Sequence, residues 1–126
     1  MEDFNNFTIP LKEAKEWTTQ WQRNNPNLSK AFLLPVENLL GCLQEMGVLK
    51  IDSDGKATIT LGKDQKVRTY IGLDEKKTQK LIMVGTKNEN GVYKDLISEN
   101  EDNNSGIYDF SRPCPYDCDL SSPLNN

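Results

Sequence analysis

Two cysteines near the C-terminal end are the side chains most able to do chemistry. Cys114 and Cys118 have three residues between them, so the pair can close a small disulfide, share a metal ion or stay as free thiols. A redox motif normally has two residues between its cysteines, and its reactive thiol needs a lowered pKa. Here the neighbouring Asp109, Asp117 and Asp119 would raise the thiol pKa instead. We expect structural thiols or a bracing disulfide, with metal and redox roles as alternatives.

Other ligands and catalytic groups are scarce. A zinc site needs four ligands, and the third cysteine, Cys42, lies in an expected helix beside apolar residues, where free cysteines usually act as small core side chains. The chain contains no histidine, which excludes Ser-His-Asp catalysis, Cys-His catalysis and histidine-containing zinc sites. No glycine-rich loop precedes a helix, so a phosphate-binding signature is also lacking. We therefore expect a non-enzymatic chain with no cofactor, no catalytic residue and no metal, apart from the weaker metal alternative at Cys114 and Cys118.

The run Asp52-Ser53-Asp54-Gly55 has part of the pattern of a calcium loop. A complete EF-hand loop carries a glutamate six residues after its glycine, and that position is Leu61 here. An Asp-Gly pair between alternating segments is a strong hairpin signal. The sequence therefore predicts a β-hairpin turn at this run and no calcium site.

Charge is unevenly distributed along the chain. The net charge is −4, and residues 88–126 hold Lys94 and Arg112 against eight acidic residues. Nucleic-acid binding proteins usually present a basic face, because phosphate neutralisation supplies most of their affinity. This chain has no basic run, so we expect no nucleic-acid partner. The acidic third suits either a basic partner protein or a solvated tail that aids solubility.

No apolar run approaches the roughly 20 residues that span a bilayer. The first six residues carry acid where a signal peptide carries base, and no apolar stretch follows them. From this we expect a cytoplasmic protein with no membrane partner.

The periodicity of apolar residues predicts two helices followed by strands. The first helix runs from Leu11 to about Asn24, and the second from Val36 to about Met46. After Gly47 the period changes from near 3.6 to 2. Strands are expected at 31–34, 48–51, 56–61, 67–73, 81–84, 92–97 and 107–110, with 81–84 at the sheet centre because it is apolar on both faces.

These elements predict an α+β fold. Two N-terminal helices would pack on one face of a roughly five-stranded antiparallel sheet, with an irregular C-terminal tail. We expect a single domain over residues 1–110 and a tail over 111–126 that either packs on the domain or hangs free.

Two tryptophans lie one helical turn apart in the first helix. Leu11, Ala14, Trp17 and Trp21 share one face, which favours a core position, although large aromatic side chains are also enriched at binding hot spots. A further possibility is a small-ligand pocket between the helices and the sheet, lined by Trp17, Trp21 and Tyr70.

One stretch of the chain is distinctive as a pattern. It comprises Ile107-Tyr108-Asp109-Phe110-Ser111-Arg112-Pro113-Cys114-Pro115, followed by Cys118-Asp119 and Ser122-Pro123-Leu124-Asn125. Together with Ala14-Lys15-Glu16-Trp17 and Ala31-Phe32-Leu33-Leu34-Pro35, this stretch resembles a family of short bacterial proteins, mostly from Bacteroidota. The resemblance covers most of the chain and implies a family without a known activity, so it supplies no chemistry.

The sequence therefore favours a protein-interaction module: a small accessory, regulatory or immunity-type protein, monomeric or a small homo-oligomer. A thiol or metal module at Cys114 and Cys118 and a small-ligand domain are the alternatives. The expected partner-contact residues are Arg112, Tyr116, Asp117, Asp119, Trp17 and Trp21.

Overall fold

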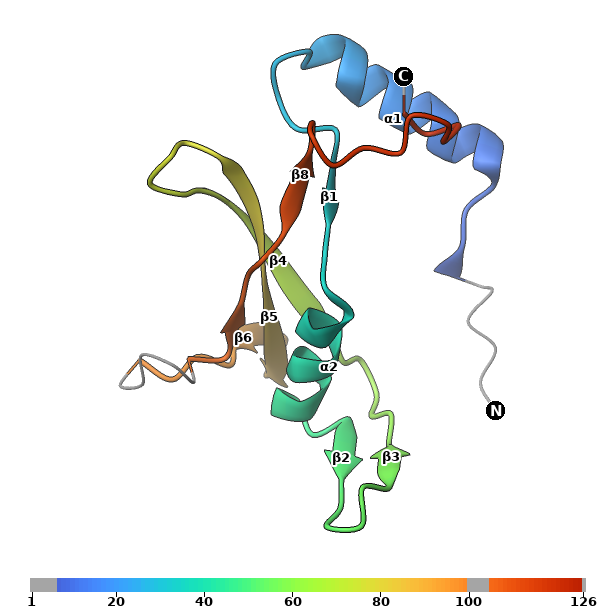
Figure 1. The fold of residues 1–126 in the computed structure, drawn as a ribbon. Coiled ribbons are helices and arrows are strands. Elements are labelled where there is room, and N and C mark those ends of the chain that lie inside the picture. The colour runs from blue at the N-terminus through green and yellow to red at the C-terminus, as the bar shows by residue number, and fades with distance from the viewer. Residues whose placement is uncertain (1–6, 100–104, 126) are drawn as a thin grey trace. The chain divides into compact units, whose positions relative to one another are not determined.

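A computed structural model of the chain describes residues 7–99 and 105–125, so residues 1–6, whose acidic character bore on the expected location, lie outside the described part. The chain forms two compact units (Figure 1): residues 1–32 with 113–126, called unit 1, and residues 33–112, called unit 2. The expected domain boundary at residue 110 stays a prediction. The elements are α1 (Leu11–Asn24), β1 (Ala31–Leu33), α2 (Val36–Glu45), β2 (Leu49–Ile51), β3 (Ala57–Ile59), β4 (Val67–Leu73), β5 (Gln79–Glu89), β6 (Val92–Asp95), β7 (Ile107–Tyr108) and β8 (Arg112–Cys114).

The expected α+β class is confirmed by these two helices and antiparallel strands. The strands form small sheets in place of one meander: β1 pairs with β8, β2 with β3, and β4, β5, β6 and β7 make a four-stranded sheet. The short strand expected at 31–34 is confirmed as β1. Within the described residues, neither helix has the length and apolar character needed to cross a membrane.

Helix α1 of unit 1 has the predicted ends. Pro10 precedes it in an extended conformation, and the Ala14 amide donates to the Pro10 carbonyl at 3.1 Å. Its C-terminal end is closed by Asn25, whose backbone and side-chain nitrogens both donate to the Trp21 carbonyl. Pro26 then follows, and a proline disfavours helical conformation in the residue before it.

The buried face of α1 differs from the predicted one. Gln22 is its one buried residue, and Thr18, one turn earlier, is half-buried. Trp17 is 60% exposed, and Leu11 and Trp21 are exposed as well. The prediction that the tryptophans fill a core is therefore wrong for this structure, because the face that carries the polar Thr18 and Gln22 is the one that packs.

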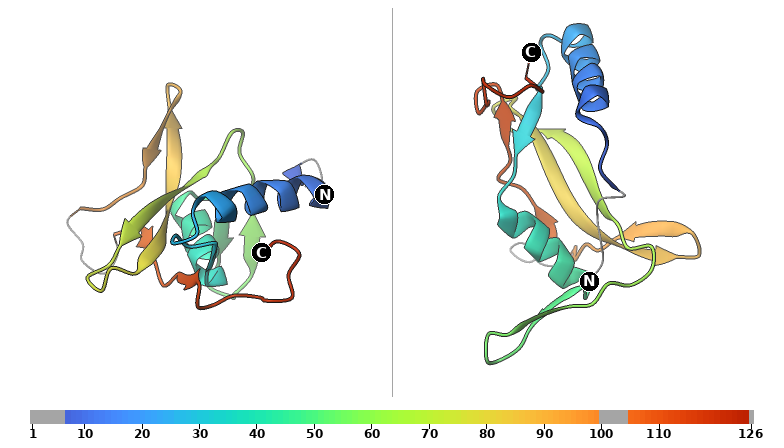
Figure 2. Two further views of the ribbon diagram at one scale, coloured as in Figure 1. Left: turned by 90° about the horizontal axis from the view of Figure 1, so that it is seen from above. Right: turned by 90° about the vertical axis from the view of Figure 1, so that its right-hand side faces the viewer.

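The central sheet of unit 2 is organised around β5. Residues Gln79–Gly85 pair with β4, Thr86–Glu89 pair with β6, and Met83 and Val84 also pair with β7. Both views of Figure 2 show β4 and β5 running side by side. The predicted central position of residues 81–84 is confirmed, and the flanking strands explain why Met83 and Val84 are buried.

The predicted hairpin turn at Asp52–Gly55 is also confirmed. The Asp52 amide donates to the Lys56 carbonyl at 3.0 Å, and the Asp52 carboxylate accepts from the amides of Asp54 and Lys56. Gly55 has φ +80°, which favours glycine because it has no Cβ. The Asp52 side chain therefore stabilises the turn between β2 and β3.

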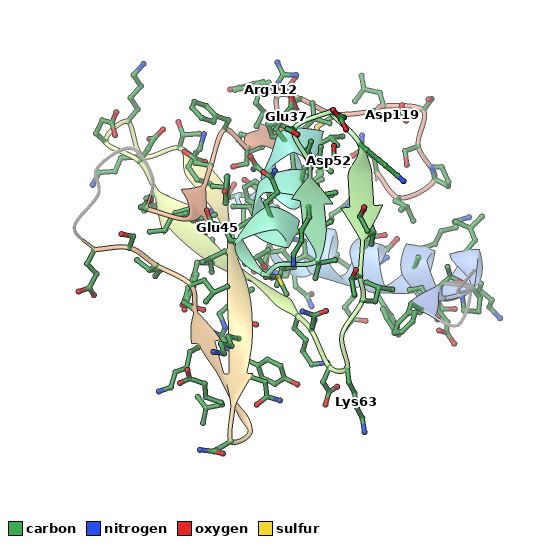
Figure 3. The ribbon with its side chains drawn as sticks, turned by 90° about the horizontal axis from the view of Figure 1, so that it is seen from below. Glu37, Glu45, Asp52, Lys63, Arg112 and Asp119 are labelled. Atoms are coloured by element: carbon green, nitrogen blue, oxygen red, sulfur yellow. A yellow bond between two sulfur atoms is a disulfide. The ribbon has the colours of Figure 1, made fainter. Side chains whose placement is uncertain are left out.

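Helix α2 packs closely on the sheet through two glycines. A Cβ at Gly85 of β5 would lie 2.8 Å from Met46 Cγ and 3.2 Å from the Cys42 carbonyl oxygen. A Cβ at Gly41 of α2 would collide with the ring of Tyr108 in β7. The Tyr108 hydroxyl donates to Glu45, labelled in Figure 3, at 3.4 Å.

This close approach explains which face of α2 is buried. Leu39 and Leu40 of α2 are exposed, whereas Asn38, Gly41 and Cys42 are buried. Asn38 is satisfied there, because its side-chain nitrogen donates to the Asp109 carbonyl at 2.7 Å. The expectation that Cys42 acts as a small core side chain is confirmed. Burial and, to a lesser degree, Glu45 raise the pKa of its thiol.

Candidate functional site

The structure resolves the alternatives for the C-terminal cysteine pair as a disulfide. Cys114 ends strand β8 and Cys118 follows four residues later, with their Cα atoms 4.8 Å apart. Cys114 is buried, and its carbonyl accepts from the Lys30 amide just before β1. The disulfide thus closes a small ring on a segment that is also held by the β1–β8 pair.

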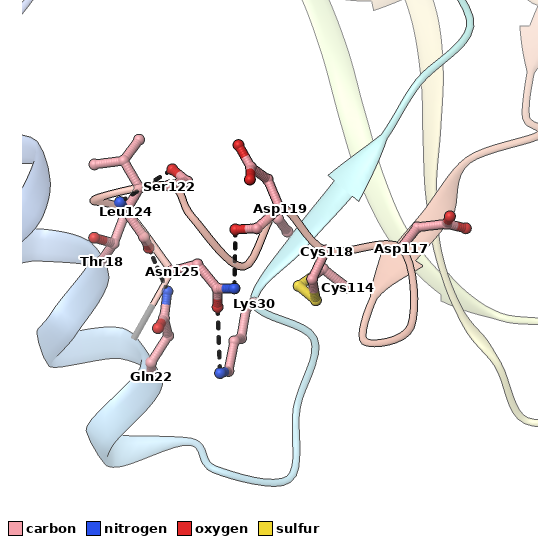
Figure 4. Close-up of a pocket in the computed structure, with 11 residues that line it drawn as sticks. Thr18, Gln22, Lys30, Cys114, Asp117, Cys118, Asp119, Ser122, Leu124 and Asn125 are labelled. Carbon is pink, nitrogen blue, oxygen red and sulfur yellow. Dashed lines mark hydrogen bonds between the residues drawn. A yellow bond between two sulfur atoms is a disulfide. The ribbon is translucent and has the colours of Figure 1, made fainter.

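Hydrogen bonds hold the rest of this segment, residues 113–125, on unit 1. We call residues 113–125 the C-terminal loop. The Gln22 side chain of α1 donates to the Leu124 carbonyl at 2.9 Å. Lys30 Nζ donates to Asn125 Oδ1 at 3.4 Å, and Asn125 Nδ2 donates to the Asp119 carbonyl at 3.1 Å (Figure 4). The tail expected over 111–126 is therefore packed over residues 113–125, and it is not irregular throughout, because Arg112–Cys114 forms strand β8 and pairs with β1.

A cavity of about 240 Å³ lies between α1 and the C-terminal loop, inside unit 1. Figure 4 shows that the Asp117 side chain at its rim points away from Gln22 and Lys30. The cavity contains no tryptophan, so its lining differs from the predicted pocket of Trp17, Trp21 and Tyr70. Its lining residues are Thr18, Gln22, Lys30, Ala31, Cys114, Asp117, Cys118, Asp119, Ser122, Leu124 and Asn125.

Five of the six expected partner-contact residues lie in unit 1. They are Trp17, Trp21, Tyr116, Asp117 and Asp119, whereas Arg112 is the last residue of unit 2. Tyr116 lies inside the disulfide ring and is 100% exposed, and Leu120, which sequence reasoning missed, is 86% exposed. Trp21 is partly engaged, because its indole nitrogen donates to the Ser29 carbonyl at 3.0 Å.

The acidic side chain just after the ring is held in its charged form. Asp119 Oδ1 accepts from the Ser121 hydroxyl at 2.7 Å and from the Ser121 amide at 3.1 Å. The hydroxyl contact, followed by the amide contact, lowers the pKa of the Asp119 carboxyl. The C-terminal loop therefore keeps a negative charge at Asp119, three residues after the exposed Tyr116.

The three cysteines are divided between the two units. Cys114 and Cys118 are joined in unit 1, and Cys42 lies in unit 2. Within residues 7–99 and 105–125, no three His, Cys, Asp or Glu side chains are grouped so as to hold a metal ion.

Sequence reasoning missed a polar cluster on the sheet of unit 2. The Tyr70 hydroxyl donates to Asp95 Oδ2 at 2.5 Å, and Arg68 donates both to Asp95 Oδ1 and to the Tyr93 carbonyl. The Tyr70 hydrogen bond and then Arg68 lower the pKa of the Asp95 carboxyl. Arg68 and Tyr70 are two positions apart in β4 and therefore lie on the same face, as the sequence alone indicates. Their shared partner Asp95 comes from β6, and its position opposite them depends on the registers of β4 with β5 and of β5 with β6.

Comparison of the chain with protein-family models, curated proteins and solved structures found no match. The resemblance to short Bacteroidota proteins therefore stays a prediction. What the structure itself supplies is a disulfide-closed loop that presents an exposed tyrosine.

Proposed function

We propose that this chain is a non-enzymatic protein-interaction module whose contact surface is the C-terminal loop. The observation that carries the proposal is the full exposure of Tyr116 within the ring closed by Cys114 and Cys118. A fully exposed side chain on a braced segment is available to a partner, and tyrosine is enriched at the energetic centres of interfaces.

The bracing of the loop favours binding. Association costs free energy for every segment that must be ordered, so a loop already fixed by a covalent ring loses less on binding. Beyond the ring, the contacts of Gln22 with Leu124 and of Lys30 with Asn125 fix the remainder of the loop. Tyr116 and Leu120 are then offered to a partner from a backbone that is already ordered.

The charge of the loop points to a basic partner surface. Asp117 and Asp119 follow the exposed tyrosine closely in the chain, and Asp119 is held ionised by Ser121. Complementary charge at the rim of an interface accelerates encounter and disfavours wrong partners. The proposal accordingly involves a protein partner, and neither nucleic acid, membrane, cofactor nor catalysis.

The thiol or metal alternative has weaker support. It needs Cys114 and Cys118 as thiolates, whereas both sulfurs are consumed in the disulfide. For the small-ligand alternative, the cavity between α1 and the C-terminal loop has a volume of about 240 Å³, which is below the roughly 300–1,000 Å³ typical of ligand pockets. A cavity of about 480 Å³ in unit 2 is large enough, but its lining residues are mostly polar and include no aromatic side chain, whereas ligand pockets are mostly lined by hydrophobic and aromatic side chains.

The disulfide also bears on the expected cytoplasmic location. Cytosolic thiols are kept reduced, and structural disulfides persist mainly in oxidising compartments. In a cytoplasmic setting Cys114 and Cys118 would be thiols and the loop would lose its covalent brace. Thiol alkylation in freshly opened cells measures the redox state of the pair. Free thiols would support the cytoplasmic location, and a disulfide would support an oxidising compartment.

The proposal is tested by affinity capture with tagged, oxidised full-length chain from a native lysate of the source organism. A protein captured in near-stoichiometric amount by the wild type should be lost with Tyr116→Ala and with Leu120→Asp. Phe110→Ala is the matched control, since Phe110 is an exposed aromatic residue of unit 2, and this variant should capture normally.

Two results would oppose the proposal. Equal capture by the wild type and by a variant that carries both loop substitutions would remove the loop as the contact surface. Absence of any partner, together with one equivalent of zinc or iron in a reduced preparation that disappears in Cys114→Ser/Cys118→Ser, would favour the metal alternative.

A further inference from the structure

Strand β4 lies at an edge of the sheet in unit 2. Among the described strands, β5 alone pairs with β4, whereas β5 itself pairs with β4 on one side and with β6 and β7. A free edge presents unpaired amides and carbonyls, which form a template for another strand. Such edges are usually short or interrupted, but β4 extends over 7 residues without a proline.

The turn between β4 and β5 identifies which backbone groups are free. The Asp74 amide donates to the Thr78 carbonyl at 3.0 Å. In an antiparallel pair the inward and outward groups alternate along the strand. The backbone groups of Arg68, Tyr70 and Gly72 therefore face β5, and those of Val67, Thr69, Ile71 and Leu73 face the free edge.

We propose that two copies of the chain pair antiparallel through β4, on a two-fold axis at Tyr70. In this register Val67 lies opposite Leu73 of the second copy, and Thr69 lies opposite Ile71 of the second copy. The backbone amides and carbonyls that face the free edge of one copy therefore meet those that face the free edge of the other. The sheets of the two copies then continue into one another. The contact uses residues of unit 2 alone.

An opposite-charge pair supports this register. The residues that flank β4 are Lys66 and Asp74, and the two-fold register opposes Lys66 of each copy with the second copy's Asp74. Lys66 also lies 3.9 Å from Asp64 of its own chain, in a pair whose side chains are both more than half exposed. A shift of two residues that brings Lys66 opposite Gly72 loses the pair with Asp74. Opposite charges placed directly across paired strands stabilise the pairing.

The side chains of β4 also favour a second copy. Val67, Ile71 and Leu73 lie on one face of the strand, and all three are exposed, Ile71 by 75%. Pairing places each of them beside a β-branched or apolar side chain of the second copy, and such cross-strand pairs stabilise sheets. On the opposite face Tyr70 meets its own counterpart, with its hydroxyl anchored on Asp95.

The proposal predicts a pattern of amide exchange in the full-length chain. At high concentration the amides of Val67, Thr69, Ile71 and Leu73 should be protected, and on dilution their exchange should speed up. The amides that face β5, such as that of Tyr70, should be protected at both concentrations. Outward amides that exchange equally fast at every concentration would overturn the proposal.

Sedimentation equilibrium measures the dimer directly. Ile71→Lys should raise the dimer dissociation constant by more than about tenfold, since a charge enters each edge of a two-fold contact. Ile59→Lys is the matched control, because Ile59 is an exposed isoleucine on β3, and this variant should dimerise as the wild type does. Equal weakening by both variants would overturn the proposal.

A charge variant keeps the test decisive if Ile71→Lys fails to fold. Lys66 is a half-exposed side chain, so Lys66→Glu should leave the fold intact, as far-ultraviolet circular dichroism can check. It should raise the dissociation constant roughly tenfold, because the new carboxylate opposes Asp74 of the second copy, and adding Asp74→Asn should recover part of the loss. A wild type that is monomeric at every concentration, or that grows into open-ended aggregates, contradicts the closed pair.

Discussion

Unit 2 has a small apolar core, in which α2 contributes Cys42 and β5 contributes Met83 and Val84, and backbone hydrogen bonds join its strands. Unit 1 differs, because Gln22 and Cys114 are the only buried residues among those that the structure describes in it. Unit 1 is instead closed by a disulfide and by hydrogen bonds from side chains to backbone. The difference follows from size, because a small unit cannot remove enough apolar surface from water and needs another constraint. It implies that the two units should respond to different perturbations.

The largest effect is expected from filling the contact between α2 and β5. Gly85→Ala should lower the free energy of unfolding of unit 2 by about 2 kcal/mol, because the new methyl group overpacks against Met46 and the Cys42 carbonyl. Gly72→Ala is the matched control, since its Cβ would come no nearer than 3.4 Å to Ile82. Urea unfolding followed by amide exchange at Val84 measures both, and equal losses would mean that close packing at Gly85 is unimportant.

Loss of the disulfide should act on unit 1 alone. Cys114→Ser/Cys118→Ser removes a small covalent ring, which is worth about 2 kcal/mol in the chain-entropy description. Limited proteolysis should then cut within residues 113–125, while amide exchange at Val84 in unit 2 stays as in the wild type. If unit 2 loosens by the same amount, the two units are not stabilised separately.

A smaller effect in unit 1 is expected from the buried glutamine. Gln22→Ala removes the hydrogen bond to the Leu124 carbonyl and should cost about 1 kcal/mol. Gln20→Ala removes an exposed side chain of the same type from the same helix and should cost little. Amide exchange of the last residues of the C-terminal loop compares the two variants. Equal exchange rates in Gln22→Ala and Gln20→Ala would show that the Gln22 hydrogen bond contributes no stability.

The smallest effect is an acid dependence confined to unit 2. The folded-state pKa of Asp95 is lowered from 3.8, first by the Tyr70 hydroxyl and then by Arg68. Its contribution to stability is therefore complete above the unfolded pKa and is lost as the pH falls through the lowered folded value. Tyr70→Phe should reduce this loss, and unfolding curves between about pH 2 and pH 5 compare the variants. An unchanged acid profile would show that the cluster does not contribute.

Local signals in the sequence predicted the elements well. Pro10 and Pro26 set the ends of α1, and the doubly apolar Leu81–Val84 predicted a central strand. These predictions succeeded because each depends on a few neighbouring residues. The prediction for the buried face of α1 was wrong, because an apolar stripe was expected to be buried. Gln22 is buried instead, and its side chain donates a hydrogen bond to the carbonyl of Leu124, 102 positions away in the chain.

The candidate site was predicted in part for the same reason. The cysteine pair and Tyr116 were recognisable from the sequence, but spacing alone left disulfide, thiols and metal open. The cluster of Arg68, Tyr70 and Asp95 needs the registers of β4 with β5 and of β5 with β6, which no local pattern determines. Contacts between distant segments were therefore the part that sequence reasoning could not supply.

The grouping of α1 with the C-terminal loop has a consequence for the order of folding on the ribosome. Gln22 leaves the ribosome 102 residues before Leu124, its hydrogen-bond partner, whereas every strand of the central sheet in unit 2 is made between residues 67 and 108. Domains generally fold as their residues emerge during synthesis. The residues of unit 2 therefore all emerge before those of unit 1 are complete, and α1 must wait for residues 113–125 to emerge before it meets the segment that completes unit 1.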